Sequence, residues 1–457
     1  MTISKDIFRA YDIRGIVENA LTPDAVQQIG QAFATEALSQ GQKTVVIGRD
    51  GRLSSPELAK RLSEGLCAGG CDVIDVGMVP TPVLYYATHK LETGTGIMVT
   101  GSHNPPQYNG LKMLIAGNTL YGDGITALYD MIIEGRLNSG EGKHSEQDIL
   151  PDYLDTIVDD IKLDKPLNIA VDCGNGVAGV CATELFTRLG CKVTELFCDV
   201  DGNFPNHHPD PSKPENLLDL QNAMKQNALD LGLAFDGDGD RVGILDDKQN
   251  ILWADRQMML YSADVLKRKP GAQIIFDIKS TSNLKAYIEN LGGEPLMWKT
   301  GHSFIKAKMK ETGAELAGEM SGHIFFKERW FGFDDGLYGA ARMLEIVSQF
   351  DEPSSAIFER LPDSVNTPEL QVNFEEGEHY KFMDTFIAQS DFEGADTVTI
   401  DGIRVNYPNG WGLIRPSNTT PCLVLRFEAN DEATLKDIQN TFREKMLAVN
   451  NSLVLPF

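Results

Sequence analysis

The sequence predicts an α/β protein with three similar domains, each built on a mixed or parallel sheet, and a smaller α+β domain at the carboxyl end. Three observations support this prediction. The chain has 457 residues, too many for one hydrophobic core and typical of about three or four domains. Short apolar runs alternate with helical patterns over most of the chain, as in βαβ units. Near the carboxyl end, polar and apolar residues alternate as in antiparallel strands.

The first domain opens this alternation of helix and strand. A helix is expected from Thr22-Pro23-Asp24, because a threonine N-cap, a proline in the first turn and an acidic residue favour a helix start. The expected strands are 44–47, 72–76 and 97–99, and a second helix starts at Ser55-Pro56. In such sheets the functional residues gather at the carboxyl ends of the strands. The turns that contain Arg49 and Ser102 lie at these ends.

The same plan appears twice more along the chain. A stretch rich in glycine, serine and charge at 137–148 precedes an amphipathic helix and a strand at 167–171. A third strand at 273–276 leads into a helix that stops at Gly292-Gly293. The expected domains are 1–148, 149–250, 251–363 and 364–457.

The last domain is expected to hold an antiparallel sheet with one exposed face. Residues 398–405 and the apolar residues of 423–427 alternate in the manner of half-exposed strands. A helical stripe follows, formed by Leu435, Ile438, Phe442 and Met446. The pattern indicates a small α+β domain that acts as a lid.

Composition limits the partners and the compartment. The formal net charge of −25 opposes binding to nucleic acid or to an anionic membrane, although a small phosphorylated ligand needs only local positive charge. No apolar run is long enough to span a bilayer, and the amino terminus lacks a signal-peptide pattern, so we expect a cytoplasmic protein. The seven cysteines are odd in number and include no CxxC pair, which predicts buried reduced thiols.

The first candidate for chemistry is the turn after the strand at 97–99. Ser102 lies in this polar turn, beside His103 and ten residues before Lys112. A serine hydroxyl carries phosphate or attacks only when a base, a cation or a metal activates it. Taken alone, the segment is more typical of an ordinary serine/asparagine turn, and the other loops of the chain favour the functional interpretation.

The second candidate follows the apolar strand 231–235. Asp236, Asp238 and Asp240 are separated only by glycine and would repel one another without a cation. An EF-hand calcium loop is the competing interpretation, but Arg241 stands where that loop needs glycine, and a strand precedes the loop. Hard oxygen ligands with little else predict magnesium.

Two further loops have a composition suited to a sugar phosphate. Residues 318–323 place Glu319, Ser321 and His323 between glycines, which suits the recognition of a polyhydroxylated ring. Residues 415–420 offer the Arg415 guanidinium, hydroxyl groups and turn amides, as phosphate-binding loops do.

Together these four loops resemble the α-D-phosphohexomutase superfamily, in the same order along the chain. The chain is most similar to the bacterial phosphomannomutase/phosphoglucomutase branch, which the segments 11–15 (Tyr-Asp-Ile-Arg-Gly) and 332–336 (Gly-Phe-Asp-Asp-Gly) also match. The resemblance covers essentially the whole chain. It implies a heart-shaped molecule whose four domains each contribute one loop to a central cleft.

The resemblance also implies the reaction, namely reversible transfer of phosphate between the 1- and 6-hydroxyls of mannose or glucose through a phosphoserine and a hexose 1,6-bisphosphate. Glucose 1,6-bisphosphate is the implied activator, and Mg²⁺ the implied metal, held by Ser102, Asp236, Asp238 and Asp240. The implied catalytic residues are Ser102, His103, Lys112, Arg241 and His323. The implied substrate-binding residues are Tyr11, Arg14, Lys279, His302, Glu319, Ser321, His323, Arg415, Ser417, Asn418 and Thr419.

Several points stay open at this stage. Lys112, His103 and His323 are all candidates for the base, and the sequence does not fix the preference between mannose and glucose. A sugar phosphatase or phosphotransferase that uses the same phosphoserine and metal is the alternative enzyme, and a metal-dependent sugar-phosphate binder is the non-enzymatic alternative. The expected partners are small phosphosugars, and the expected state is a monomer.

Overall fold

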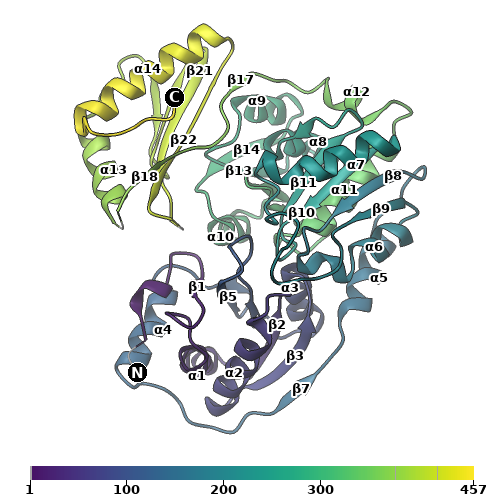
Figure 1. The fold of residues 1–457 in the computed structure, drawn as a ribbon, viewed down its shortest axis with the longest axis vertical. Coiled ribbons are helices and arrows are strands. Elements are labelled where there is room, and N and C mark those ends of the chain that lie inside the picture. The colour runs from purple at the N-terminus through teal and green to yellow at the C-terminus, as the bar shows by residue number, and fades with distance from the viewer. Residues whose placement is uncertain (1–2, 376, 419) are drawn as a thin grey trace.

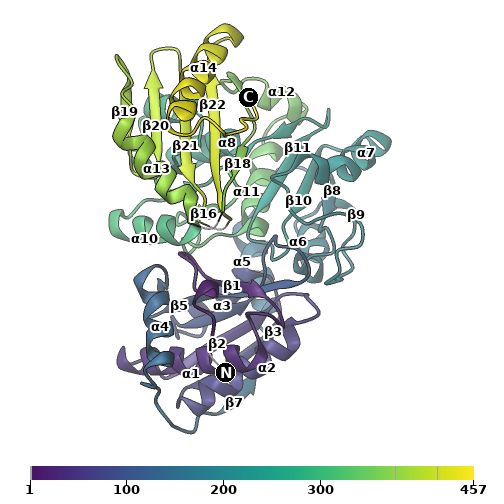
Figure 2. The same ribbon diagram turned by 60° about the vertical axis from the view of Figure 1, so that its left-hand side comes forward.

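The computed structural model describes residues 3–375, 377–418 and 420–457. Four α/β units follow one another along an arc, and the first and fourth units face each other across the open side (Figure 1). A turned view shows the fourth unit above the first, with the second and third units beside them (Figure 2). Among the described residues, no helix has the length and apolarity needed to cross a bilayer.

The first unit is built on a mixed sheet of strand order β1-β5-β4-β2-β3-β7, with β6 paired to β5. Strand β2 runs parallel to β3 and β4, whereas β5 is antiparallel to β1 and β4. Thr22 caps the first helix by accepting a hydrogen bond from Ala25 N, as the sequence predicts. The elements are β1 (Ile13–Ile16), α1 (Pro23–Ser39), β2 (Thr44–Arg49), α2 (Ser55–Ala68), β3 (Asp72–Met78), α3 (Thr81–Lys90), β4 (Gly96–Val99), β5 (Tyr108–Ile115), β6 (Asn118–Thr119), α4 (Asp123–Ile133) and β7 (His144–Glu146).

The second and third units repeat the layered plan with smaller mixed sheets. Their strand orders are β12-β11-β10-β8-β9 and β14-β13-β15-β16. The second unit contains α5 (Leu150–Asp160), β8 (Asn168–Asp172), α6 (Ala182–Arg188), β9 (Lys192–Leu196), α7 (Leu218–Asn227), β10 (Leu231–Phe235), β11 (Val242–Asp246) and β12 (Ile251–Leu252). The third contains α8 (Ala254–Arg268), β13 (Gln273–Asp277), α9 (Ser282–Asn290), β14 (Glu294–Trp298), α10 (His302–Thr312), β15 (Leu316–Gly318), β16 (Ile324–Phe326), α11 (Gly336–Ser348) and α12 (Ser354–Phe358).

The fourth unit is an antiparallel sheet of order β17-β22-β21-β20-β19, with β18 also paired to β22. Two helices, α13 and α14, pack together, and α14 covers β21 and β22. The elements are β17 (Val365–Asn366), β18 (Leu370–Asn373), α13 (Glu378–Gln389), β19 (Asp396–Val398), β20 (Ile403–Tyr407), β21 (Gly410–Pro416), β22 (Cys422–Ala429) and α14 (Glu432–Val449). The expected strand 398–405 is therefore two strands joined by a turn.

The prediction that one face of this sheet is exposed is wrong for the central strands β20, β21 and β22, although the edge strands β18 and β19 have exposed residues. All residues of β22 are buried, including Arg426 and Glu428 on the face away from the helices. That face packs on the third unit, where Arg426 Nη1 donates to the Lys279 carbonyl and to Asp255 Oδ2, 3.0 Å away. Arg404 Nη1 likewise donates to the carbonyl of Ile278 (2.6 Å). Alternation in a strand shows that one face is polar, but a polar face can still be buried against another domain.

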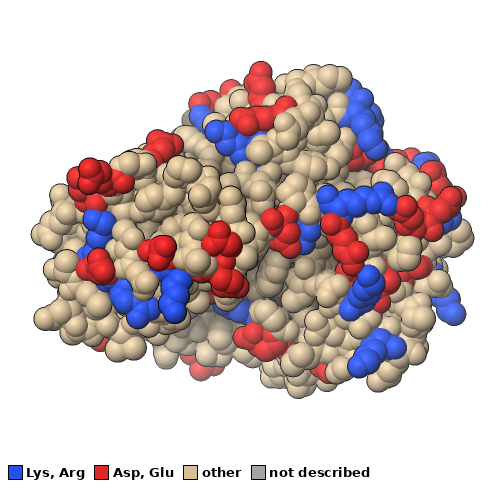
Figure 3. Space-filling model, turned by 90° about the horizontal axis from the view of Figure 1, so that it is seen from above, with Lys and Arg blue, Asp and Glu red and all other residues tan. Residues whose placement is uncertain are grey.

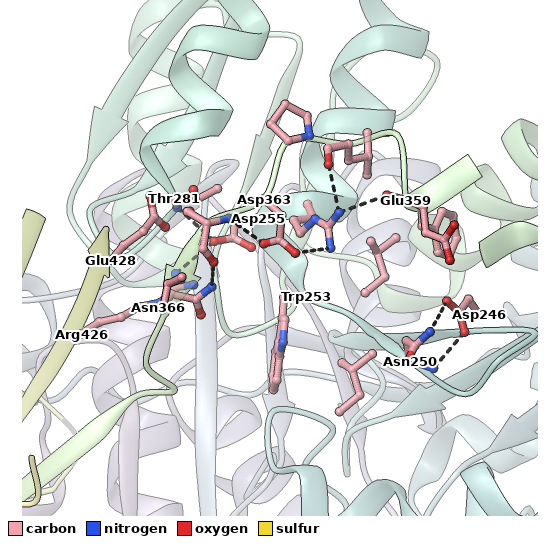
Figure 4. A pocket seen from close by; sticks show the side chains of 18 residues that line it. Asp246, Asn250, Trp253, Asp255, Thr281, Glu359, Asp363, Asn366, Arg426 and Glu428 are labelled. Carbon is pink, nitrogen blue, oxygen red and sulfur yellow. Dashed lines mark hydrogen bonds and ion pairs between the residues drawn. The ribbon is translucent and has the colours of Figure 1, made fainter. Parts of the chain in front are cut away.

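The hydrophobic core is divided unevenly. One cluster of buried residues runs from the first unit through the second and third, whereas the fourth unit has a cluster of its own. A cavity of about 610 Å³ lies where the linker between the third and fourth units passes β12 and β22. Figure 4 shows its polar walls, including Asp255, Asp363 and Arg426. The fourth unit therefore has its own core, and a small apolar cluster of Ile278, Trp411 and Leu413 joins it to the third unit.

All seven cysteines are free, as predicted. Five of them are buried, but Cys67 and Cys198 are only half-buried. Acidic and basic side chains are interspersed on the face seen from above, and that face shows no continuous basic patch (Figure 3).

Candidate active site

The serine loop leaves the buried strand β4 and enters a left-handed turn. Ser102 has φ +49°, a conformation that L residues adopt at a cost, and only 1% of the residue is exposed. Its Oγ lies 3.1 Å from His103 Nδ1 and donates to Asp236 Oδ2 at 3.3 Å. The hydroxyl thus sits between an imidazole and the first aspartate of the metal loop.

A buried arginine holds this loop from behind. The Arg52 guanidinium donates to four backbone carbonyls of the loop, those of Ser102 (2.7 Å), Asn104 (2.6 Å), Pro105 (2.7 Å) and Tyr108 (3.1 Å). Arg52 is 1% exposed and touches the loop so closely that a Cβ at position 101 would lie 2.5 Å from its guanidinium carbon. This contact explains why a glycine precedes Ser102.

Asp50 completes the support of the loop. Its carboxylate pairs with Arg52 Nε at 3.1 Å and accepts hydrogen bonds from Thr100 Oγ1 (2.9 Å) and Gly101 N (3.2 Å). Arg49, a candidate from the sequence at the end of the same strand, lines a surface hollow with His144 and Glu146 instead. Arg49 is therefore not brought into the site, and Asp50 and Arg52 take its place.

The three aspartates follow β10 and are completely buried, each with 0% exposure. Candidate ligand atoms from Asp236, Asp238 and Asp240 lie within 4.8 Å of one another. Asp238 Oδ1 is buried without a hydrogen-bond partner. Burial, followed by repulsion from the other two carboxylates, raises the pKa of Asp236 well above its ordinary value. Three converging carboxylates and an unsatisfied oxygen fit a hard divalent cation such as Mg²⁺.

Lys112 on β5 reaches the same carboxylates. Its Nζ lies 2.7 Å from Asp238 Oδ2 and also pairs with Asp240. Although burial acts against it, the charges of Asp238 and Asp240 raise the pKa of Lys112. In contrast, burial and then the charge of Arg241 keep the pKa of His103 well below its usual range. The ammonium is therefore charged and the imidazole of His103 is neutral.

The loop after β15 closes the site from the third unit. His323 Nε2 lies 3.2 Å from Asp240 Oδ1, and His323 Nδ1 lies 3.0 Å from Glu319 Oε2. Burial opposes the protonated form, but Asp240 raises the pKa of His323 to about 9. Ser321 Oγ is 3.1 Å from the same Nδ1, and Glu319 Oε1 accepts a hydrogen bond from Gly301 N. Glu319 and Ser321 thus both contact the His323 imidazole.

Arg14 and Tyr11 bring the start of the chain to the site. Arg14 Nη1 donates to Asn104 Oδ1 of the serine loop at 2.8 Å. The Tyr11 hydroxyl donates to the Thr300 carbonyl at 3.0 Å and accepts a hydrogen bond from Asn418 Nδ2 of the fourth unit. Tyr11 therefore joins the first, third and fourth units.

The loop of the fourth unit lies on the opposite side of the site. Arg415 is 4% exposed, its Nε donates to Asp401 Oδ2 at 2.9 Å, and its positive charge acts on both Tyr11 and Lys279. Lys279 in turn pairs with Glu369. Ser417 Oγ is within 3.1 Å of Thr420 Oγ1, whereas the predicted residue Thr419 lies outside the described residues. Arg415 and Lys279 thus place two buried cations close to each other, with Arg415 also acting on Tyr11.

The fold brings further polar residues to this site, and two of them, Thr81 and Asp334, had no role predicted from the sequence. Lys306 Nζ lies 2.7 Å from Asp334 Oδ1, and Thr81 Oγ1 donates to Asp238 Oδ2 at 2.5 Å. His302 Nδ1 is 3.6 Å from Asp334 Oδ2. Asp334 belongs to the segment 332–336, which the resemblance had already marked, so this segment was the one signal for it.

Comparison with known families covers nearly the whole chain. The family "Phosphoglucomutase/phosphomannomutase, alpha/beta/alpha domain I" matches residues 5–137, domain II matches 151–249, domain III matches 253–365, and the C-terminal domain matches 369–445.

Individual proteins agree with these matches. A phosphomannomutase/phosphoglucomutase of Pseudomonas aeruginosa PAO1 is 55% identical over 456 residues, which cover 100% of this chain and 98% of the relative. The crystal structure of a phosphoglucomutase/phosphomannomutase family protein from Burkholderia thailandensis is 52% identical, with TM-score 0.94 and 100% of both chains covered. An Aspergillus fumigatus N-acetylphosphoglucosamine mutase, solved with GlcNAc-6P and magnesium, shares the fold at 14% identity, with TM-score 0.63 and coverage of 95% and 96% of the two chains.

Proposed function

We propose how this chain works from the premise that it belongs to the α-D-phosphohexomutase superfamily, in its bacterial phosphomannomutase/phosphoglucomutase branch. It is an enzyme that interconverts hexose 1-phosphates and hexose 6-phosphates. The observation that carries this conclusion is the 55% identity to a phosphomannomutase/phosphoglucomutase over 100% of the chain. The substrates proposed for it are the phosphates of mannose and glucose.

Ser102 is the phosphate carrier in this proposal. Unaided phosphate-monoester hydrolysis is among the slowest of biological reactions, so a covalent carrier and dense electrostatic stabilisation suit the task. The phosphoryl group passes from Ser102 Oγ to the free hydroxyl of a hexose 1-phosphate, the Oγ–P bond breaks, and the sugar proton leaves to a base. The resulting 1,6-bisphosphate turns over in the cleft and returns its other phosphate to Ser102.

Asp236, Asp238 and Asp240 are the proposed holders of Mg²⁺, together with an oxygen on Ser102. Their burial, their mutual repulsion and the unsatisfied Asp238 Oδ1 support this assignment, and the A. fumigatus mutase of the same fold was solved with magnesium. The ion, when bound, supplies positive charge that stabilises the transferring phosphoryl group. Glucose 1,6-bisphosphate is the proposed activator, because it can rephosphorylate Ser102 after an intermediate has been lost.

The protein groups around Ser102 divide the remaining work. Arg241 and Lys112 offer positive charge to the transferring group. His103 is neutral and lies 3.1 Å from Ser102 Oγ, so its imidazole can accept a proton. A magnesium ion bound to Asp238 and Asp240 would lower the pKa of Lys112, which makes Lys112 the second candidate for the base. His323, whose pKa is raised to about 9, is the proposed acid.

The opposite side of the cleft is assigned to the phosphate that is not reacting. Arg415, Ser417 and Asn418 surround it in this proposal, with Lys279, Tyr11 and Arg14 contributing further donors, and Thr419 keeps this role as a prediction from the sequence. His302, Glu319 and Ser321 are assigned to the sugar hydroxyls. Guanidinium and hydroxyl donors at a fixed distance from Ser102 position the reacting hydroxyl, as in other sites that work by proximity.

A Ser102→Ala variant tests the carrier. Intact-mass measurement should show about one phosphate on the wild type and none on the variant, and the variant should have no mutase activity while its circular dichroism is unchanged. A coupled assay with mannose 1-phosphate and glucose 1-phosphate, with and without glucose 1,6-bisphosphate, measures the reaction. An active Ser102→Ala enzyme would refute the assignment, and release of inorganic phosphate as the main product would point to the phosphatase alternative.

A further inference from the structure

Four buried side chains meet where the second unit touches the third. Asp240 comes from the metal loop, His302 from the start of α10, His323 from the loop after β15, and Asp334 from the segment before α11. Their exposed fractions are 0%, 7%, 4% and 0% in that order. His323 Nε2 lies 3.2 Å from Asp240 Oδ1 and 3.9 Å from Asp334 Oδ2, and His302 Nδ1 lies 3.6 Å from Asp334 Oδ2.

Three of these four facing atoms are unsatisfied. Asp240 Oδ1, Asp334 Oδ2 and His302 Nδ1 are all buried without a hydrogen-bond partner. Burying a polar atom without a partner is costly, so unsatisfied atoms that face one another indicate a missing ligand. The fourth atom, His323 Nε2, lies 3.2 Å from Arg241 Nε and 3.2 Å from Asp240 Oδ1.

We propose that Asp240, His302, His323 and Asp334 form a binding site for a divalent transition-metal ion such as Zn²⁺, which adjoins the all-oxygen site of Asp236, Asp238 and Asp240 and shares Asp240 with it. Two imidazoles and two carboxylates suit zinc or cobalt and not magnesium, which prefers oxygen ligands. Bonds of about 2.0–2.1 Å place neighbouring ligand atoms of a tetrahedral site about 3.3 Å apart. His323 Nε2 is 3.2 Å from Asp240 Oδ1 and 3.9 Å from Asp334 Oδ2, and candidate ligand atoms of these three residues lie within 4.8 Å of one another. His302 Nδ1, 3.6 Å from Asp334 Oδ2, lies outside that group and would move closer to complete the four ligands.

The surroundings of the four side chains fit outer partners of a metal site. Glu319 Oε2 lies 3.0 Å from His323 Nδ1, so the carboxylate orients the imidazole with Nε2 toward the site. Lys306 Nζ holds the other oxygen of Asp334 at 2.7 Å, and Lys112 pairs with Asp240 Oδ2. In both Asp240 and Asp334, one carboxylate oxygen therefore pairs with a lysine while the other faces the imidazoles.

The same neighbours limit the affinity. Lys112, Lys306 and Arg241 place positive charge beside the site, and an incoming ion must displace Arg241 from His323 Nε2. A bound ion would join Asp240 of the second unit to three residues of the third and would remove His302 and His323 from the sugar. Its effect on the enzyme is therefore inhibition that excess Mg²⁺ does not reverse.

Cobalt provides a probe that does not depend on activity. Co²⁺ bound by two imidazoles and two carboxylates in tetrahedral geometry absorbs visible light more strongly than octahedral Co²⁺ with oxygen ligands. Purified full-length protein in excess Mg²⁺ is titrated with Co²⁺, and the absorption and the bound metal after equilibrium dialysis are recorded. Zn²⁺ is then added to displace the cobalt, with thermal unfolding as an independent record of binding.

Matched variants locate the ion. His302→Gln and Asp334→Asn should each bind one equivalent of Co²⁺ fewer than the wild type and lose the strong absorption. His144→Gln is the control, because His144 is an exposed histidine of the first unit and should leave both readouts unchanged. Asp238→Asn, which weakens the magnesium loop alone, should keep the absorption, so failure of the magnesium assignment would not be mistaken for failure of this one.

Two results would overturn the proposal. The first is a wild type that shows no tetrahedral cobalt spectrum at any Co²⁺ concentration that leaves it folded. The second is a spectrum that survives in His302→Gln and in Asp334→Asn, both shown to be folded by circular dichroism. Either result would mean that the unsatisfied atoms serve the sugar phosphate alone.

Discussion

Replacing Arg52 by lysine should slow catalysis without weakening substrate binding. The side chain has no place among the groups assigned to the sugar phosphate, yet it donates to four carbonyls of the serine loop. Lysine keeps a positive charge beside Asp50, but its single ammonium cannot donate to all four carbonyls at once as the planar guanidinium does. The left-handed Ser102 backbone, with φ +49°, is then free to relax.

The size of the effect follows from what the guanidinium does. A misplacement of about 1 Å at a reacting group can cost about 100-fold in rate, so kcat of Arg52→Lys should fall about 100-fold while KM stays within about a factor of two. Arg52→Met goes further, because it leaves Asp50 as an unpaired buried charge. Breaking a buried ion pair in this way costs about 3–5 kcal/mol, so the free energy of unfolding should fall by that amount.

Three measurements separate positioning from a general loss of stability. Steady-state kinetics give kcat and KM, intact mass gives the phosphate carried by Ser102, and denaturant unfolding gives the stability. Arg342→Lys is the matched control, because Arg342 is also completely buried and bonds the Glu328 carbonyl, but in the third unit away from the serine loop. Wild-type kcat in a folded Arg52→Lys enzyme, or an equal loss of kcat in Arg342→Lys, would refute the reasoning.

Three further predictions concern the metal, the phosphate loop and pH. Asp238→Asn should weaken Mg²⁺ binding measured by calorimetry and reduce activity in limiting magnesium, and unchanged affinity would exclude Asp238 as a ligand. Arg415→Ala should raise KM about 10-fold or more, as expected for a lost charged hydrogen bond of about 1.5–3 kcal/mol, while the phosphate on Ser102 remains; unchanged kinetics would mean that Arg415 serves only Asp401. In magnesium-free protein the raised pKa of His323 makes its ion pairs fully stabilising below pH 6.5 and weaker as the pH rises through about 9. His323→Gln should therefore lose less thermal stability than the wild type over that interval, and parallel curves for the two proteins would contradict it.

The parts of the site that could be predicted from sequence are those whose signal is local. Asp236, Asp238 and Asp240 follow a completely apolar strand and are separated only by glycine, so repulsion alone points to a cation. Ser102 likewise follows a short buried strand directly. The sequence shows which residues follow the carboxyl end of a strand. Ligands of α/β sheets bind at those ends, so these residues can be predicted to belong to the site.

The parts that could not be predicted depend on contacts between distant segments. Arg52 and its carbonyl partners are separated by 50 to 56 positions, and Asp334 reaches Lys306 across 28. Arg49 ends β2 and Arg52 lies in the turn after it, and nothing in the sequence distinguishes the two arginines. Only the direction in which each side chain leaves the sheet decides which one contacts the serine loop. The polar face of β22 was likewise expected in solvent, because Arg426 and Glu428 carry no sign of the domain that covers them.

That covered face bears on how the fourth unit moves. Its contact with the third unit combines charged side chains, since Arg404 and Arg426 donate to backbone carbonyls of the segment 278–280, with a small apolar cluster of Ile278, Trp411 and Leu413. Hydrogen bonds of this kind exchange with water at little net cost, whereas the continuous apolar core of the first three units cannot be opened without exposing it. The unit also has its own core and borders the cavity at the linker. We therefore expect a rigid rotation about that linker to leave the serine loop and the aspartates undisturbed while it carries Arg415 toward or away from them, which is the motion a clamp on the distant phosphate requires.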